Sequence, residues 1–376
     1  MLHGRENRMT SDASILFRPF DVKTLHMKNR VVMAPMTRDF SPKGVPGENV
    51  VEYYRKRAAG GVGLIVTEGT TINHPAASGS DNYPRFHGDA LPAWKKVVEA
   101  VHAEGGLIAP QLWHLGMMRN AKAVFNPEVP SVGPSGLKVP GKRSGHTLTE
   151  SEIGDIIAAF AEGAVDARAI GFDAAEFHGA HGYLIDQFFW DGTNERTDQW
   201  GGDLVGRARF GLEVVKAARA AVGPDFPLIL RISQWKQQDF TKRLANTPAE
   251  WEAFITPFVD AGVDVFHCST RRFWEPEFEG SDLNLAGWTK KLTGKPTITV
   301  GSVSLGGSDD FIAAFAGQGA EIAAIDDLVN RMEKGEFDLV AIGRALLANP
   351  DWPNKVKAGR FSDLNAYSKD VLVELV

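Results

Sequence analysis

The sequence predicts an α/β fold, a single (β/α)8 TIM barrel with loop excursions on its C-terminal face. Three observations predict this class. Eight short apolar runs recur along the chain, helical patterns separate most of them, and polar side chains gather where the runs stop. Strands that alternate with helices favour parallel βαβ units, and eight units close more naturally into a barrel than they extend an open sheet. Parallel barrels build active sites at the carboxyl ends of their strands, so this pattern indicates an enzyme.

The eight apolar runs lack regular polar alternation, which is typical of strands that are covered on both faces. The predicted strands are Val31–Pro35, Val62–Thr67, Leu107–Leu112, Phe172–Phe177, Pro227–Ile232, Val263–Cys268, Pro296–Val300 and Asp338–Ile342. A doubly wound open sheet is the weaker alternative, because no Gly-x-Gly-x-x-Gly motif follows a strand and opens a helix.

Apolar residues at spacings of three and four predict the helices between these strands. The expected helices are Glu48–Ala59, Ala90–Glu104, Glu152–Ile170, Val205–Val222, Ala249–Ala261, Glu321–Met332 and Pro353–Ala358. Thr149 and Glu152 have the spacing of a capping box. Asn126–Thr147, rich in Pro, Gly and Ser, is expected to be an excursion on the active face, and Arg271–Leu285 and Gly301–Gly319 are further candidate insertions.

Composition limits the function classes. The net charge of −6 over 376 residues argues against nucleic acid as a main partner. The single cysteine, Cys268, cannot form an internal disulfide, which fits a reducing compartment and excludes a multi-cysteine metal site. No apolar stretch approaches the ~20 residues that span a bilayer, and no signal peptide is evident, so a cytoplasmic location is expected. Residues 1–14 are expected to form a flexible tail, and residues 15–376 the barrel.

Two glycine-containing loops follow the last two predicted strands, at Gly301–Ser302 and Gly343–Arg344. Barrels often bind phosphate between these loops through backbone N–H groups, and an arginine adds a charge-assisted contact. A surface salt bridge of Arg344 is the alternative.

Arg231 is the penultimate residue of an apolar run. Burying its guanidinium is costly unless it meets an anion or several acceptors. The residue is therefore either one half of a structural ion pair or a cation aimed at charge that develops in the barrel mouth.

His178, His181 and Tyr183 follow the fourth run closely. The histidine pair is a weak metal signal, because no carboxylate or third histidine completes a site, and we expect no metal. The second interpretation has both histidines bind a substrate oxygen while Tyr183, protonated at neutral pH, acts as general acid. In a third interpretation, all three are polar residues whose hydrogen-bonding groups are satisfied within a packed loop.

Other polar and aromatic residues lie near the same strand ends. Thr37 and Gln111 end the first and third strands, and each offers a donor and an acceptor. Trp113 and Phe273 are candidates to line an apolar substrate cleft. Taken singly, each of these four residues is as compatible with a capping or packing role as with a ligand contact.

Together these residues resemble the Old Yellow Enzyme family of FMN-dependent ene-reductases. The resemblance runs from about Phe17 to Gly359, and its matching segments are Asn29–Arg38, Pro110–Gly116, His178–Phe188, Thr193–Gly202 and Ala341–Leu346. Thr37 stands where one subgroup has cysteine, so the chain resembles the threonine-type branch. The resemblance implies an eight-stranded barrel, a noncovalent FMN, and NAD(P)H as the hydride-donating substrate in the same cleft.

The resemblance also implies roles for single residues. Pro35, Met36 and Thr37 would pass along the flavin, Gly69 would let the backbone approach the ring, Gln111 would bind the pyrimidine edge, and Arg231 would face N1 and O2. Gly301, Ser302, Gly343 and Arg344 would bind the phosphate. His178 and His181 would hold the carbonyl or nitro oxygen of an electron-poor alkene, Tyr183 would protonate its α-carbon, and Trp113 and Phe273 would line the substrate pocket.

Two alternatives to the ene-reductase stay open from the residues alone. One is a barrel isomerase or aldolase that binds a phosphorylated substrate and uses His178 or Tyr183 as acid. Its aldolase form is weakened because no lysine stands at a predicted strand end for a Schiff base. The other is a flavin-binding barrel without turnover.

Overall fold

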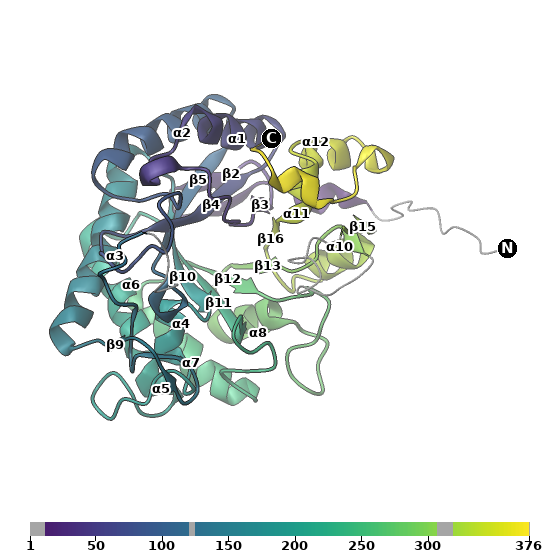
Figure 1. The fold of residues 1–376 in the computed structure, drawn as a ribbon. Coiled ribbons are helices and arrows are strands. Elements are labelled where there is room, and N and C mark those ends of the chain that lie inside the picture. The colour runs from purple at the N-terminus through teal and green to yellow at the C-terminus, as the bar shows by residue number, and fades with distance from the viewer. Residues whose placement is uncertain (1–11, 120–124, 307–318, 376) are drawn as a thin grey trace.

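The computed structural model describes residues 12–119, 125–306 and 319–375. Eight parallel strands close into a barrel with helices around the outside, which confirms the predicted fold class (Figure 1). Around the barrel the strands are β3 (Val31–Met33), β4 (Leu64–Thr71), β5 (Leu107–Trp113), β10 (Ala175–His181), β11 (Leu228–Lys236), β12 (Val265–Ser269), β13 (Thr297–Val300) and β16 (Leu339–Ile342).

All eight predicted strands are present, but three of them continue four residues further than expected. β4 includes Glu68 and Gly69, which were placed after it, and β10 includes both His178 and His181. β11 extends to Lys236, so Arg231 lies in its middle. These extensions include polar side chains that bond to distant segments, as Thr70 does to the Gln111 carbonyl and Lys236 to Asp186, so an apolar pattern does not reveal them.

The expectation that no lysine stands at a strand end was wrong, because Lys236 is the last residue of β11. Its ammonium group lies 2.5 Å from the Asp186 carboxylate, and both side chains are fully buried. Burial lowers the pKa of Lys236 and raises the pKa of Asp186, so each ion depends on the other to stay charged. A lysine held in this way is not available to form a Schiff base.

Most predicted helices have the expected position. The outer helices are α1 (Glu48–Ala59), α2 (Leu91–Ala103), α3 (Glu150–Ile170), α6 (Arg209–Val222), α7 (Pro248–Ala261), α10 (Asp326–Glu333) and α12 (Trp352–Lys357). The expected helix Val205–Val222 is divided, with a short α5 (Leu204–Arg207) before α6, and Glu321–Ile322 forms strand β15 instead of opening α10. α4 (Leu184–Phe189), α8 (Leu285–Thr293) and α11 (Arg344–Ala348) were not predicted. The capping box at Thr149 and Glu152 is present.

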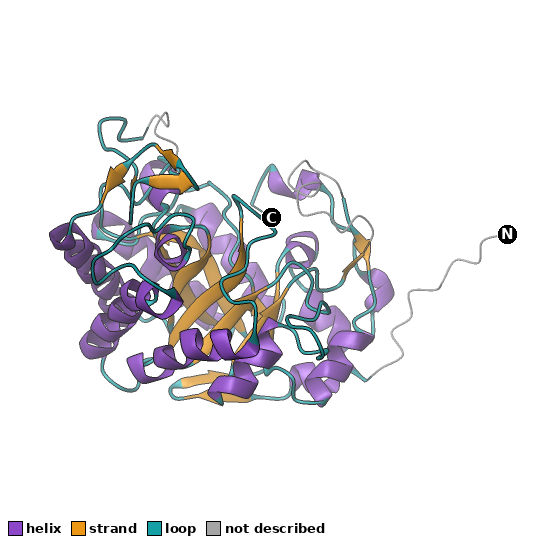
Figure 2. Ribbon diagram, turned by 90° about the horizontal axis from the view of Figure 1, so that it is seen from below, coloured by secondary structure: helices purple, strands orange, loops and turns teal. Residues whose placement is uncertain are grey.

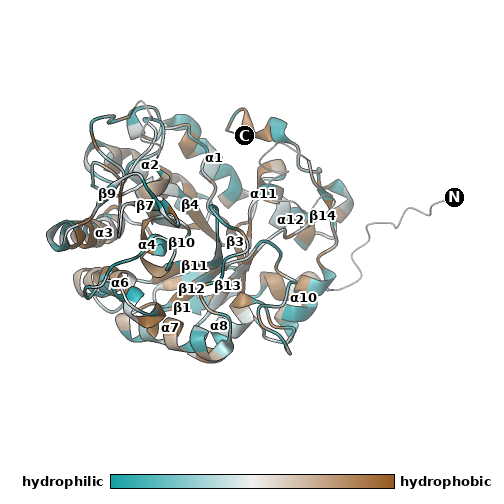
Figure 3. Ribbon diagram, turned by 60° about the horizontal axis from the view of Figure 1, so that its bottom comes forward, coloured by the Kyte–Doolittle hydropathy of each residue, from teal (hydrophilic) through white to brown (hydrophobic). Residues whose placement is uncertain are grey.

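The core has two layers. The larger cluster lies between the strands and the surrounding helices, whose mixed colours in Figure 3 show an apolar face and a polar face. The smaller cluster fills the amino end of the barrel, where a hairpin of β1 (Phe20–Val22) and β2 (Leu25–Met27) packs Leu25 and Met27 against inward residues of the strands. The amino end is thereby closed (Figure 2).

The expected excursion Asn126–Thr147 contains four short strands at the opposite end from that hairpin (Figure 2). β6 (Val132–Gly133) pairs with β9 (His146–Thr147), and β7 (Leu137–Val139) pairs with β8 (Lys142–Arg143). Of the expected insertion Gly301–Gly319, β14 (Leu305–Gly306) pairs with β15, while residues 307–318 lie outside the described residues. The remaining short helical turns are Ala13–Phe17, Pro42–Gly44, Gly88–Ala90, Gly116–Met118, Phe361–Asp363 and Lys369–Leu372.

The two ends of the described chain are anchored to the barrel region. Asp12 caps the turn Ala13–Phe17, so of the expected tail only residues 1–11 lie outside the description. Near the other end, Arg38 donates hydrogen bonds to the carbonyl oxygens of Val371 and Glu374. In the described part of the chain, no helix is long and apolar enough to cross a membrane.

Candidate active site at the carboxyl end of the barrel

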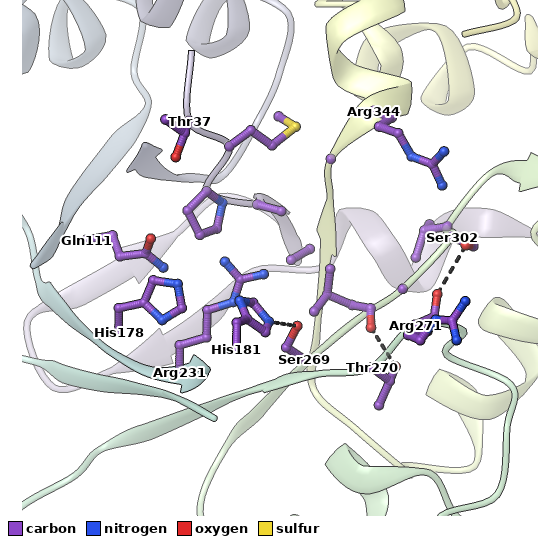
Figure 4. A pocket seen from close by; sticks show the side chains of 18 of the residues that line it. Thr37, Gln111, His178, His181, Arg231, Ser269, Thr270, Arg271, Ser302 and Arg344 are labelled. Atoms are coloured by element: carbon purple, nitrogen blue, oxygen red, sulfur yellow. Dashed lines mark hydrogen bonds between the residues drawn. The ribbon is translucent and has the colours of Figure 1, made fainter. Parts of the chain in front are cut away.

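A cavity of about 510 Å³ opens at the carboxyl ends of the barrel strands. The predicted site residues that line it are Pro35, Met36, Thr37, Gln111, Trp113, His178, His181, Tyr183, Arg231, Gly301, Ser302, Gly343 and Arg344. Figure 4 shows Thr37, Gln111, His178, His181 and Arg231 at one side of the cavity and Arg271, Ser302 and Arg344 at the other.

Two predicted residues, Gly69 and Phe273, are not among those that line the cavity. A Cβ atom at Gly69 would lie 2.5 Å from the Trp113 ring, so this glycine makes room for the indole. Phe273 is only 5% exposed and packs into the outer core, edge-on to Trp274. Its backbone amide donates to the Gly301 carbonyl, so its loop supports the cavity wall from behind.

Arg231 is the most unusual charge in the cavity. Its side chain is 7% exposed, and no hydrogen bond or ion pair to it exists within the described ranges. Burial lowers the pKa of Arg231, although the nearby Glu176 and Tyr183 oppose this shift. A buried guanidinium without an acceptor is costly, so the site is built for a ligand that brings negative charge or several acceptor atoms.

Gln111 is oriented by a buried network. Its Nε2 donates to one oxygen of Glu176 at 2.8 Å, and the other oxygen of Glu176 lies 2.7 Å from His267 Nδ1. The side chains of Glu176 and His267 are fully buried. Because the amide nitrogen is used by Glu176, the amide oxygen of Gln111 is left as an acceptor for a donor group in the cavity.

The rings of His178, His181 and Tyr183 cluster on one wall. The ring centre of His178 lies 5.0 Å from that of His181 and 4.9 Å from that of Tyr183. His181 Nε2 is hydrogen-bonded to Ser269 Oγ at 2.7 Å (Figure 4), whereas the buried Nδ1 of His178 has no partner among the described residues. The wall therefore offers unused polar atoms beside the unpaired arginine.

Burial sets the charge of these three rings. It depresses the pKa of both histidines well below the ordinary range, and the positive charge of Arg231 lowers them further. Burial also raises the pKa of Tyr183. At neutral pH the histidines are therefore uncharged hydrogen-bonding groups, and Tyr183 keeps its proton. Within the described ranges, no cluster of three or more metal-ligating side chains exists.

The opposite side of the cavity suits an anion. Gly301 has φ of +145°, and a Cβ there would lie 2.7 Å from the Thr270 carbonyl oxygen, so the tight turn requires glycine. Ser302 follows with φ of +49° and donates from Oγ to the Arg271 carbonyl. The guanidinium groups of Arg271 and Arg344 lie on either side of Ser302 in Figure 4. Two arginines beside a glycine turn can bind a phosphate.

Several lining residues were not predicted, notably Arg38, Trp235, Gln237 and Arg271. Trp235 stacks on His181 with ring centres 4.5 Å apart, and Gln237 Nε2 donates to the Tyr183 hydroxyl at 3.1 Å. Trp235 lies four residues after Arg231 on β11, and alternate residues of a strand share one face, so this alternation could have identified Trp235. Gln237 lies one residue beyond β11, where the alternation does not apply. No comparable signal marks Arg271, whose position depends on a loop.

Comparisons with known proteins agree with this fold. The model of the NADH:flavin oxidoreductase / NADH oxidase family matches residues 15–363. The metal reductase of Desulforamulus reducens is 34% identical over 358 residues, which are 92% of this chain and 49% of that protein. This chain thus spans about half the length of that relative.

Two solved structures are similar over nearly their whole length. Morphinone reductase in complex with tetrahydroNAD has a TM-score of 0.77 and 31% identity, with 95% of this chain and 93% of that chain covered. Old Yellow Enzyme from Pichia sp. AKU4542 has a TM-score of 0.78 and 25% identity, with 95% and 90% covered.

Proposed function

The chain belongs to the NADH:flavin oxidoreductase / NADH oxidase family, and from this premise we propose that it is an FMN-dependent, NAD(P)H-driven ene-reductase. Its substrates would be α,β-unsaturated carbonyl or nitro compounds, whose C=C bond it reduces. The observation that carries the proposal is the buried Arg231, which has no partner within the described ranges and shares one cavity with Gln111, His178, His181 and Tyr183.

The residues of the cavity fit FMN. Arg231 would compensate negative charge on the flavin ring, while the Gln111 amide oxygen would accept a hydrogen bond from it and the Thr37 hydroxyl would contact it. The Gly301–Ser302 turn and the loop of Gly343 and Arg344 would hold the phosphate at the other side of the cavity. Bound FMN, once reduced by NAD(P)H, supplies the hydride, and the protein supplies position and electrostatics.

His178 and His181 would bind the substrate oxygen. Because burial keeps both rings neutral, they can hydrogen-bond that oxygen without adding a full positive charge beside Arg231. Hydrogen bonds to the oxygen draw electron density away from the β-carbon, which favours hydride addition there. Ser269 fixes the His181 ring through its hydrogen bond to Nε2.

Tyr183 would give its proton to the α-carbon. Its raised pKa keeps the phenol protonated across the neutral range, as a general acid requires. The Trp113 ring meets Tyr183 edge-on at 4.9 Å and His178 lies 4.9 Å away on another side, so the phenol has a fixed place beside the histidine pair.

The remaining expectations belong to this proposal. Residues 15–376 would form one FMN-binding barrel, in the threonine-type branch to which Thr37 points. The buried, unpaired Cys268 and the net charge of −6 support a cytoplasmic location and small-molecule partners in place of nucleic acid.

One spectroscopic experiment tests the proposed function. Purified protein supplied with FMN should retain flavin absorbance, lose it anaerobically with NADH or NADPH, and regain it on addition of 2-cyclohexenone. Failure to bind FMN would favour the isomerase. Bound flavin that neither nicotinamide bleaches would favour a binding protein without turnover, and bleaching without reoxidation by the alkene would refute the ene-reductase.

A further inference from the structure

The last residues of strand β11 contact the turn that contains His181 and Tyr183 and hold it in place. After a register shift, Lys236 pairs with His181 across the β10–β11 ladder. The Ser233 hydroxyl accepts the backbone N–H of His181 at 3.0 Å. Asp186, the partner of Lys236, accepts the backbone N–H of Gly182 at 2.7 Å. This extension is therefore tied to each residue of the turn that precedes Tyr183.

The turn needs this support because its backbone is unusual. His181 has φ of +66° and Gly182 has φ of +79°. A left-handed conformation is costly for a residue with a side chain and persists where surrounding contacts fix it. The Trp235 indole stacks on the His181 ring, and its Nε1 donates to the Ser269 carbonyl. Both the backbone and the ring of His181 are thus fixed from β11.

Gln237 makes the corresponding contact to Tyr183. Its Nε2 donates to the phenol oxygen at 3.1 Å, and its backbone N–H reaches the His181 carbonyl at 3.4 Å. Both Gln237 and Tyr183 line the cavity. A hydroxyl oxygen that accepts one hydrogen bond has its own proton directed away from that donor. Because Tyr183 itself lines the cavity, its proton remains available to a substrate bound there.

We propose that Gln237 is a positioning residue for the acid Tyr183: its amide orients the phenol proton toward the cavity and stabilises the phenolate after proton transfer. The inference rests on the proposed function. A hydrogen bond to a charged acceptor is stronger than one to a neutral acceptor, so the Gln237 contact strengthens as negative charge develops on the phenol oxygen. The same contact opposes the effect of burial on the pKa of Tyr183.

Gln237→Leu removes the donor and keeps most of the side-chain volume. We expect reoxidation of the reduced flavin by 2-cyclohexenone to slow by about tenfold, the difference between a charged and a neutral hydrogen bond. Flavin reduction by NAD(P)H does not use the phenol proton, so it should slow less than reoxidation does. In an ultraviolet difference titration of the apoprotein against Tyr183→Phe, the pKa of Tyr183 should rise by about one unit. Gln199→Leu, at an exposed glutamine on the outer surface, should change none of these quantities.

Two further variants separate positioning from a structural role. In the Tyr183→Phe background, Gln237→Leu should have no additional effect on reoxidation. In the Gln237→Glu variant, reoxidation should be slow while the carboxylate is ionised, because an ionised carboxylate can only accept hydrogen bonds. Reoxidation should recover as the pH falls, because the protonated carboxyl is a donor again. A purely structural role for Gln237 would give no such recovery.

Equal slowing by Gln237→Leu in the wild-type and Tyr183→Phe backgrounds would overturn the proposal, as would an unchanged Tyr183 titration. Failure of the proposed function is distinguishable from both results. In that case the unsubstituted protein would not be reoxidised by the alkene at all, while the titration would still report whether Gln237 contacts the phenol.

Discussion

Arg231→Met should have opposite effects on the stability of the apoprotein and on its affinity for FMN. Methionine keeps most of the length of the side chain but removes a buried charge that has no partner within the described ranges. A buried charge without a hydrogen-bond partner costs free energy in the folded state, and methionine removes that cost. We therefore expect the free energy of unfolding of the apoprotein to stay the same or rise.

FMN binding should become weaker in the same variant. A hydrogen bond to a charged group contributes about 1.5–3 kcal/mol, which corresponds to roughly 10- to 150-fold in the dissociation constant. The stabilisation that FMN gives to the folded protein should fall accordingly, since it depends on the ratio of FMN concentration to this constant. Denaturant unfolding with and without FMN, together with a fluorescence titration, measures both quantities.

Arg219→Met is the matched control at the closed end of the barrel. Arg219 donates to the carbonyl oxygens of Gly223, Phe226 and Gly262 and lies 2.5 Å from the Asp264 carboxylate. Its removal leaves these carbonyl oxygens without their donor, while Asp264 keeps its ion pair with Lys23. It should destabilise the apoprotein by about 1–3 kcal/mol and leave FMN affinity unchanged. If Arg231→Met destabilises the apoprotein as much as this control, or binds FMN normally, the reasoning about Arg231 is wrong.

Three other predictions address the remaining groups of the site. Tyr183→Phe should slow alkene-driven reoxidation by roughly 10²-fold and leave flavin reduction by NAD(P)H near normal; equal losses in the two half-reactions would assign Tyr183 a structural role. Arg344→Ala should raise the dissociation constant of FMN by roughly 10- to 150-fold and leave that of riboflavin, which lacks the phosphate, unchanged. An equal loss of affinity for both ligands would place the phosphate elsewhere. Because the pKa of His181 is depressed in the folded state, the unfolded state binds more protons below pH 6.5, and stability should fall as the pH drops through that range. His181→Asn should reduce the slope of the free energy of unfolding against pH by up to about 1.4 kcal/mol per pH unit. Denaturation series from pH 7 to 5 measure this slope, and the same slope in the variant and the unsubstituted protein would contradict the depressed pKa.

The barrel could be predicted because its strands are buried on both faces and read as apolar runs. The cavity residues of the strands and of the two glycine loops could be predicted for a related reason. A polar residue such as Gln111 or Arg231 stands out in an apolar run, and parallel strands bring all such residues to one end of the barrel.

The strand ends and loops could not be predicted in the same way. The ends of β4 and β11 consist of polar residues whose partners come from distant segments: Thr70 donates to the Gln111 carbonyl, and Lys236 pairs with Asp186. Phe273 was expected in the substrate pocket, but the path of its loop is fixed by Asn284, which donates to the Phe273 carbonyl and caps α8. Those contacts depend on the folded arrangement, which no local pattern contains.

We propose that one cavity serves both NAD(P)H and the alkene. Initial rates measured with the nicotinamide and 2-cyclohexenone varied together show whether the two substrates share it. If each substrate must leave before the other enters, double-reciprocal plots are parallel, and a phenol that binds His178 and His181 competes with NAD(P)H. Intersecting lines, with no competition between the phenol and NAD(P)H, would require two separate subsites and would refute a shared cavity.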